Sequence, residues 1–181
     1  TDACGNSSNC SQTITMVDTT APVITLKGAA EMNHEAATDF TDPGVTAADN
    51  HDSEVTVVTT GSVDNKRLGV YALTYSATDT AGNAAVEVVR TVTVVDTTLP
   101  VITLVGEALM NLDFGETFNE PGATASDTLD GDITGAIAIA GTVDTSKPGT
   151  YDITYNVTDA AGNKALELQR KVNVVDSSPP V

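Results

Sequence analysis

The chain repeats its own sequence after about 80 residues, and this repetition constrains the fold more than any other feature. The stretch Asp18-Thr-Thr-Ala-Pro-Val-Ile-Thr-Leu26 recurs 78 residues later as Asp96-Thr-Thr-Leu-Pro-Val-Ile-Thr-Leu104. A two-residue insertion near Gly135 then moves the offset to 80 for the rest of the repeat. A unit of this length is enough for one small domain, so the sequence predicts tandem copies of a single fold.

The repetition also predicts where the domains begin and end. We predict one module at residues 18–95, called the first repeat, and another at residues 96–175, called the second repeat. Residues 1–17 align with the end of each repeat and are predicted to be the last hairpin and strand of a preceding module. Residues 176–181 are predicted to start a following module or linker, so we expect an interior piece of a larger protein. Because the connection between repeats is short, we expect the modules to stack end to end.

Composition and local patterning both predict an all-β fold. The chain contains 29 Thr and 22 Val, and such β-branched residues favour strands. Apolar residues alternate with polar ones in short runs bounded by turn residues, as at Tyr71, Leu73 and Tyr75. About seven such strands in each repeat predict tandem immunoglobulin-like β-sandwiches. Tyr71 and its counterpart Tyr151 match the tyrosine corner of that fold.

One position breaks the alternation in both repeats. Arg90 and Arg170 fall on the apolar face of the last predicted strand. We therefore expect a bulge or a change of register there. The chain also has no Trp and no cysteine pair that could link two sheets, so an antibody-type domain is excluded.

The charge balance excludes several classes of partner. Twenty-five acidic and eight basic residues give a net charge of −17, which would repel nucleic acids and anionic membrane surfaces. No stretch approaches the roughly 18 apolar residues of a membrane span. We therefore expect no nucleic-acid partner and no membrane span in this segment.

The residues that enzymes need are scarce. His34 and His51 are the only histidines, and the second repeat has Leu112 and Leu129 in their places. No glycine-rich loop between a strand and a helix indicates a phosphate site. Aromatic residues make up only 4 % of the chain, which weakens both a glycosidase cleft and a sugar-stacking platform. We expect a protein that is not an enzyme.

Acidic residues of three segments are expected to converge at one end of each sandwich: the connection, the loop after the second strand and the last hairpin. Converging carboxylates repel one another unless they are protonated or bind a cation. Ca²⁺, which takes six to eight oxygen ligands, fits best, whereas the scarcity of His and Cys argues against zinc or copper. The predicted ligands are Asp18, Asp49, Glu54 and Asp79 in the first repeat and Asp96, Asp127, Asp132 and Asp159 in the second. Further candidates are Asp52, Asn83, Asp130, Asn163 and Asp176.

An alternative explains the same residues without a metal. Asp, Asn and Gly are common in turns because their side chains bond to nearby backbone groups. On this interpretation Asp159 and Asn163 only close the last hairpin, and Asp96 only organises the turn before Pro100.

The two cysteines lie close together near the beginning of the chain. If Cys4 and Cys10 form a disulfide, they close a short hairpin loop, and the bond would persist in an oxidising compartment. The alternative is two free thiols.

Several motifs resemble a known family. The Asp-Thr-Thr-x-Pro-Val-Ile-Thr-Leu opening, the Asp130-Gly-Asp-Ile-Thr134 stretch and the Thr-Asp-x-Ala-Gly-Asn turns resemble bacterial surface-protein Ig-like repeats. Asp2-Ala-Cys-Gly-Asn6 with Cys10 is similar to the related hyalin repeat, and the tandem arrangement is cadherin-like. The resemblance implies a secreted or cell-surface location, in a bacterium.

The resemblance and the acidic clusters together predict a function. We expect a non-catalytic segment of a stalk, fibre or adhesin, with Ca²⁺ making the connections between modules rigid. The expected partners are neighbouring Ig-like modules of the same chain, with like chains in a fibre or a surface glycan or protein as further candidates. One alternative is a module that binds a glycan or a protein. Another is a fibre subunit that donates residues 1–17 as a strand to its neighbour.

Overall fold

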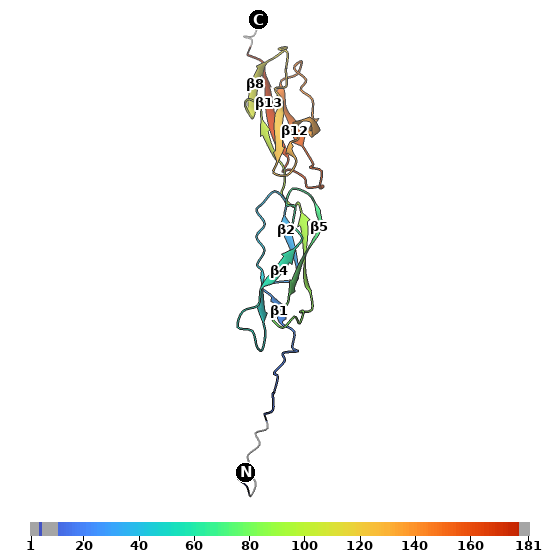
Figure 1. Ribbon diagram of the computed structural model, residues 1–181. Coiled ribbons are helices and arrows are strands. Elements are labelled where there is room, and N and C mark those ends of the chain that lie inside the picture. Colours follow the sequence, from blue (N-terminus) through green and yellow to red (C-terminus); the bar gives the residue numbers. More distant parts are fainter. Residues whose placement is uncertain (1–3, 5–10, 178–181) are drawn as a thin grey trace. The chain divides into compact units, whose positions relative to one another are not determined.

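The computed structural model describes residue 4 and residues 11–177, and almost all of its regular structure is β (Figure 1). The chain folds into two compact units. The first comprises Thr1–Met32, Thr41–Ser62 and Ala72–Thr91, and the second comprises Asn33–Phe40, Val63–Tyr71 and Val92–Val181. In the part of the chain that the structure describes, no helix has the length and apolarity needed to cross a membrane.

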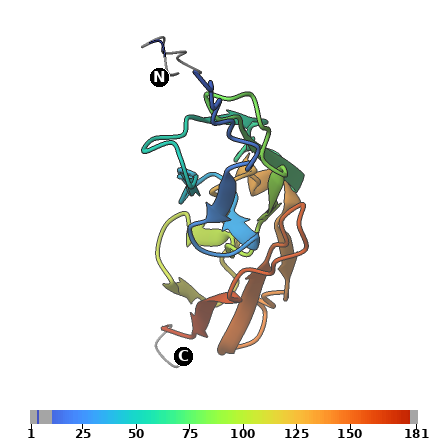
Figure 2. The ribbon, with the colours of Figure 1, turned by 60° about the horizontal axis from the view of Figure 1, so that its bottom comes forward.

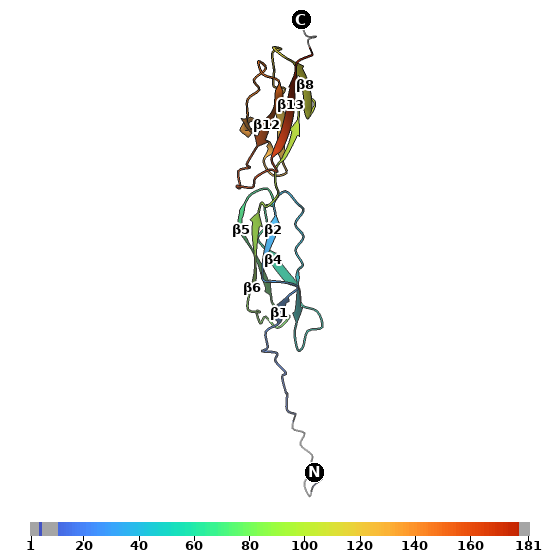
Figure 3. The same ribbon diagram turned by 180° about the vertical axis from the view of Figure 1, so that it is seen from behind.

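The first repeat contains six strands in two sheets. They are β1 (Val23–Leu26), β2 (Glu31–Glu35), β3 (Val45–Ala48), β4 (Val57–Thr60), β5 (Gly69–Ala77) and β6 (Val88–Val95). Strand β1 pairs with β3, and the other sheet has the order β2-β6-β5-β4, whose four strands are labelled in Figure 3.

The second repeat contains seven strands and one 3₁₀ turn. They are β7 (Val101–Leu104), β8 (Leu109–Asp113), β9 (Ala123–Asp127), β10 (Gly131–Asp132), η1 (Thr134–Ala136), β11 (Ala138–Ala140), β12 (Gly149–Asn156) and β13 (Leu168–Val175). One sheet has the order β10-β9-β7 and the other β11-β12-β13-β8. Strands β12 and β13 lie side by side and antiparallel (orange to red in Figure 2), whereas β13 and β8 are parallel.

These sheets confirm the all-β, immunoglobulin-like expectation, with differences in detail. Strand β2 and its counterpart β8 were not expected from the sequence, because Glu31-Met-Asn-His-Glu35 has too few apolar residues to show an alternation. The Tyr71 hydroxyl donates to the Arg67 carbonyl at 2.8 Å, and the Tyr151 hydroxyl donates to the Lys147 carbonyl at 2.9 Å. These bonds to backbone four residues upstream are those of a tyrosine corner.

Alternate residues of the long strands form the core. In the first repeat, Leu73 and Tyr75 of β5 and Val92 of β6 are buried. In the second repeat, Ile153, Tyr155 and Val172 form a buried cluster against which Ile102, Leu104, Met110, Leu112 and Phe118 pack. Burial of such side chains contributes roughly 1.5–3 kcal/mol each.

The expected bulge at the arginine position is wrong. The pairing of β12 with β13 continues without interruption through Arg170. Burial alternates regularly along both β6 and β13, and Arg90 and Arg170 are fully buried. Arg90 Nε lies 3.1 Å from Asp42 Oδ1, and its Nη2 donates to the Lys27 and Gly44 carbonyls at 2.7 and 3.0 Å. The strand needs no distortion because the buried guanidinium is neutralised and hydrogen-bonded inside the sandwich.

The second repeat builds the same arrangement with a longer acid. Glu120 forms an ion pair with Arg170 and accepts a hydrogen bond from the Tyr155 hydroxyl. Burial, followed by this hydrogen bond to Glu120, raises the pKa of Tyr155. The raised pKa favours the neutral phenol, which donates to the Glu120 carboxylate.

Some predictions concern the ends of the chain. Residues 11–17 are described and none of them belongs to a strand. The predicted Cys4–Cys10 pairing and most of the predicted hairpin within 1–17 lie outside the described residues, as do residues 178–181. The boundaries at residues 18–95 and 96–175 stay a prediction.

Candidate metal site

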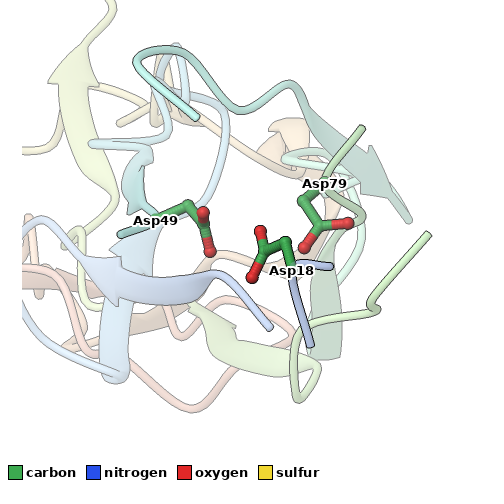
Figure 4. Close-up of side chains that lie close together, drawn as sticks. All are labelled: Asp18, Asp49 and Asp79. Carbon is green, nitrogen blue, oxygen red and sulfur yellow. The ribbon is translucent and has the colours of Figure 1, made fainter. Parts of the chain in front are cut away.

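Three aspartates converge at equivalent positions of each repeat. Asp18, Asp49 and Asp79 form the first cluster, and Asp96, Asp127 and Asp159 form the second. In each cluster every residue offers one carboxylate oxygen, and these oxygens all lie within 4.8 Å of one another. Figure 4 shows the three side chains of the first cluster pointing toward one another.

Each cluster draws on three separate segments of its repeat. Asp96 directly follows β6, and Asp127 is the last residue of β9. Asp159 lies in the hairpin between β12 and β13, just after the isolated bridge that pairs Thr158 with Lys164. An ion held by all three would tie the segment that leads into β7 to two loops of the same sandwich.

One oxygen of each aspartate is held by a nearby backbone amide. Asp127 Oδ1 accepts from Leu129 N at 2.8 Å and Asp130 N at 3.1 Å. Asp49 Oδ1 makes the equivalent bonds, and the His51 amide, followed by the Asp52 amide, lowers the pKa of this carboxyl. Such turns fix the carboxylates in place, as the turn interpretation expects.

The second oxygen of several of these carboxylates has no such partner. Asp96 is 9 % exposed and Asp127 is 8 % exposed, and the buried Oδ2 atom of each has no hydrogen-bond partner within the protein. The Oδ2 atoms of Asp18 and Asp49 are in the same situation. A buried unpaired carboxylate oxygen is costly, and turn formation explains only the Oδ1 atoms.

Burial and the neighbouring groups act differently on the carboxylates of the second cluster. For Asp96, burial has the largest effect and raises the pKa, the hydrogen bond from the Thr98 amide lowers it, and repulsion from Asp127 and Asp159 raises it. The net pKa of Asp96 lies above its ordinary value. For Asp159 burial also raises the pKa, but hydrogen bonds from Asn163 outweigh it and the net pKa is lowered. Such crowded carboxylates favour a bound cation.

The two asparagines among the further candidates connect parts of each cluster. Asn163 Nδ2 donates to Asp159 Oδ2 at 2.8 Å and to the Asp96 carbonyl at 3.1 Å. Asn83 Nδ2 donates to Asp79 Oδ2 at 2.7 Å and to the Asp18 carbonyl at 3.3 Å. Asn83 therefore fastens its hairpin to the segment that precedes β1, and Asn163 fastens its hairpin to the segment that precedes β7.

Two acids, Asp52 after β3 and Asp130 after β9, bond to the last hairpin of their own repeat. Asp52 accepts from Thr80 N at 2.7 Å and from Thr80 Oγ1 at 2.9 Å. Asp130 accepts from Ala160 N at 2.8 Å. Because their carboxylates bond to the hairpin backbone, they position Asp79 and Asp159 without joining the three-carboxylate groups.

The remaining predicted ligands lie outside these groups. Asp132 is exposed and accepts from Thr134 N at 2.9 Å. Glu54 and Asp176 are exposed as well. The structure therefore brings six of the named acids together in two sets of three.

Sequence reasoning overlooked one acid close to the second cluster. Glu35, the last residue of β2, accepts hydrogen bonds from the amides and hydroxyls of Thr97 and Thr98. Its counterpart Asp113 accepts from Ser177 Oγ at 2.8 Å. The signal available in the sequence was an acid at the same position of both repeats, together with paired hydroxyl residues after each Val-Val-Asp.

Comparison with known proteins identifies the family. The family described as bacterial surface protein, Ig-like domain, matches residues 24–94 and again residues 102–174. The chain belongs to this family. The two matched stretches include most of the β-sandwich strands of both repeats, so each repeat matches the family separately.

The relatives of this chain are longer proteins, of which it matches only a part. It is 33 % identical over 144 residues to the pesticidal crystal protein Cry22Aa of Bacillus thuringiensis, covering 74 % of the chain and 19 % of that protein. It is 31 % identical over 196 aligned residues to hyalin of Lytechinus variegatus, covering 99 % of the chain and 36 % of hyalin. The chain thus spans little more than a third of these relatives at most.

A solved structure supports the fold alone. The structure of the catalytic domain and two CBM51 domains of ZmpB from Clostridium perfringens aligns with a TM-score of 0.51 and 13 % identity. The alignment covers 89 % of this chain and 31 % of that one. The surface-protein family and the hyalin relatives indicate an extracellular or surface location and a structural or binding module.

Proposed function

We propose that the chain is a non-catalytic structural segment of a secreted or surface protein. In this proposal, Ca²⁺ bound at each aspartate cluster makes the segment that leads into each sandwich rigid. The observation that carries this proposal is the set of buried Oδ2 atoms without a partner at equivalent positions of both repeats. A ligand-binding module would need a feature that one repeat has and the other lacks, whereas a stalk needs the same metal site in every repeat.

The donor set favours calcium. Each cluster offers carboxylate oxygens from three segments, and no nitrogen or sulfur ligand belongs to the groups found among the described residues. Ca²⁺ accepts carboxylates and carbonyls in flexible geometry, whereas Mg²⁺ requires near-ideal octahedral ligands. The Asp52 and Asp130 braces hold the hairpin carboxylates in place before an ion arrives.

The ion would relieve a cost that the fold otherwise bears. Removing the repulsion among Asp96, Asp127 and Asp159 stabilises the segment that each of them anchors. Extracellular calcium modules bind with dissociation constants of about 10⁻⁴–10⁻³ M. A site of ~0.1 mM would stabilise its repeat by roughly 1.8 kcal/mol at about 2 mM calcium.

The mechanical role follows from which segments are joined. Asp96 sits in the short connection after β6, while Asp127 and Asp159 belong to loops of the second repeat. Once all three bind one ion, the connection loses the freedom to turn about its own backbone. We infer that calcium converts a flexible series of modules into a stiff one, within a stalk, fibre or adhesin whose partners are neighbouring Ig-like modules.

A calcium titration tests the proposal directly. Thermal unfolding is followed in EDTA and from micromolar to ten millimolar CaCl₂, with MgCl₂ as the control. The midpoint is expected to rise with calcium and to change little with magnesium. An unchanged midpoint in calcium would assign the aspartates to turns alone and overturn the metal proposal.

Small-angle scattering tests the mechanical part separately. The radius of gyration and the maximum dimension are measured with and without calcium on the same preparation. A stiff series should give a narrower distance distribution in calcium. If calcium raises the melting midpoint but leaves the distribution unchanged, the ion stabilises single repeats and the stiffening role is wrong.

A further inference from the structure

Glu35 holds the chain segment that carries Asp96. Its Oε1 accepts from Thr97 N at 2.8 Å, Thr98 N at 3.1 Å and Thr98 Oγ1 at 2.8 Å, and its Oε2 accepts from Thr97 Oγ1 at 2.7 Å. The neighbouring Ala36 N donates to the Val95 carbonyl at 2.7 Å, which fastens the end of β2 beside the end of β6. One carboxylate thus fixes both residues that follow Asp96.

One of these donors is shared with the cluster itself. Thr98 N also lies 3.1 Å from Asp96 Oδ1. Because this bond occupies Oδ1, the rotation of the Asp96 carboxylate is set, and the buried Oδ2 is left for the cluster. Glu35 therefore reaches the candidate ligand through a single backbone amide.

We propose that Glu35 is a positioning residue for the second cluster, which fixes the Asp96–Thr98 turn so that Asp96 Oδ2 is already placed for a divalent cation. This inference rests on the proposed function. Partners that orient metal ligands without touching the metal change its affinity by about 10–100-fold. A ligand fixed beforehand also loses less conformational freedom when the ion binds.

The chain provides its own controls. Asp18, the counterpart of Asp96, belongs to the other compact unit, so the first cluster should not respond to a change at Glu35. Asp113, the counterpart of Glu35, bonds to Ser177, which follows the second repeat. Replacing Asp113 by Asn removes one negative charge and leaves the Asp96–Thr98 turn unchanged.

The experiment isolates the second cluster and then removes its support. In an Asp49→Asn background, only Asp96, Asp127 and Asp159 remain as a complete cluster. Calcium affinity is measured by isothermal titration in this parent and after adding Glu35→Gln, Asp113→Asn, or Thr97→Val with Thr98→Val. Glu35→Gln should weaken binding about ten-fold, Asp113→Asn less than two-fold, and the valine pair a few-fold.

The valine pair separates positioning from charge. It removes the two hydroxyl donors to Glu35 and leaves every charge in place. Glu35→Asp completes the test, because it keeps the charge but shortens the side chain that both backbone amides reach. If Glu35→Gln weakens binding and neither the valine pair nor Glu35→Asp does, the effect is one of charge and the positioning role is wrong.

Other outcomes distinguish the two proposals. A parent that binds no calcium contradicts the proposed function itself, whereas a parent that binds and a Glu35→Gln variant that binds equally well contradicts only this inference. Circular dichroism in EDTA checks that each variant folds. Should Glu35→Gln not fold, Glu35→Asp carries the test, because it keeps the charge but draws the carboxylate back from Thr97 and Thr98 by one methylene group; unchanged affinity there overturns the positioning role.

Discussion

The side-chain amide of Asn163 donates a hydrogen bond of 3.1 Å to the main-chain carbonyl of Asp96, which lies 67 residues earlier in the chain. The same nitrogen donates to Asp159 Oδ2 at 2.8 Å. Asn163 therefore joins two of the three segments that form the second cluster, without a charge of its own. The first repeat has the same connection through Asn83, Asp18 and Asp79.

Replacing Asn163 should loosen this connection. Asn163→Ala removes both donated bonds, which leaves Asp159 Oδ2 and the Asp96 carbonyl without their partner. We expect a loss of about 1–3 kcal/mol in the free energy of unfolding, and calcium affinity at the second cluster about ten-fold weaker. Urea unfolding in EDTA and calorimetric titration measure the two effects. Asn83→Ala is the matched variant, and it should act on the first cluster alone.

Neutralising one cluster residue should have opposite effects with and without calcium. Asp127→Asn keeps the oxygen that accepts from Leu129 N and Asp130 N, and replaces the unpartnered Oδ2 with an amide donor. In EDTA the variant should melt higher than the wild type, because repulsion is relieved; a gain of about 1 kcal/mol corresponds to about 4–8 °C for a domain of this size. In calcium the wild type should melt at a higher temperature than Asp127→Asn.

The reversal is the informative result. If Asp127 serves the turn alone, the difference in melting midpoint between Asp127→Asn and wild type stays the same in EDTA and in calcium. Asp49→Asn tests the equivalent position of the first repeat in the same way.

The buried arginines should make the stability of each repeat depend on the acid that neutralises them. Asp42→Asn leaves the fully buried guanidinium of Arg90 without its counter-charge, and breaking such a pair costs about 3–5 kcal/mol. The exposed pair between Lys171 and Asp152, at 2.9 Å, provides the control, since Asp152→Asn should cost less than about 1 kcal/mol. Chemical unfolding measures both, and equal losses would contradict the structural role of Arg90.

The sequence could place the aspartate clusters but not all of their support. Position in the repeat was enough to group Asp96, Asp127 and Asp159, because each continues or follows a strand whose end is fixed by the sandwich. Glu35 was not predictable in this way, since β2 lacks a clear alternation and its end meets Thr97 only through the pairing of distant strands. The inward direction of Arg90 was visible, but its partner Asp42, 48 residues away, was not, and a bulge was wrongly expected.

The stability that Glu35 contributes should depend on pH in a defined direction. Hydrogen bonds, first from the Thr97 amide and then from the Thr97 hydroxyl, lower the pKa of Glu35 from 4.5 to about 2. Because the folded pKa lies below the unfolded one, the contribution is complete above about pH 4.5 to 5 and is lost as the pH falls toward 2. In EDTA, the difference in unfolding free energy between wild type and Glu35→Gln should therefore be constant from pH 7 to 5 and shrink below that. Urea unfolding at intervals of half a pH unit measures it. A difference that does not change down to pH 2.5 would show that the carboxylate form of Glu35 makes no special contribution to the fold.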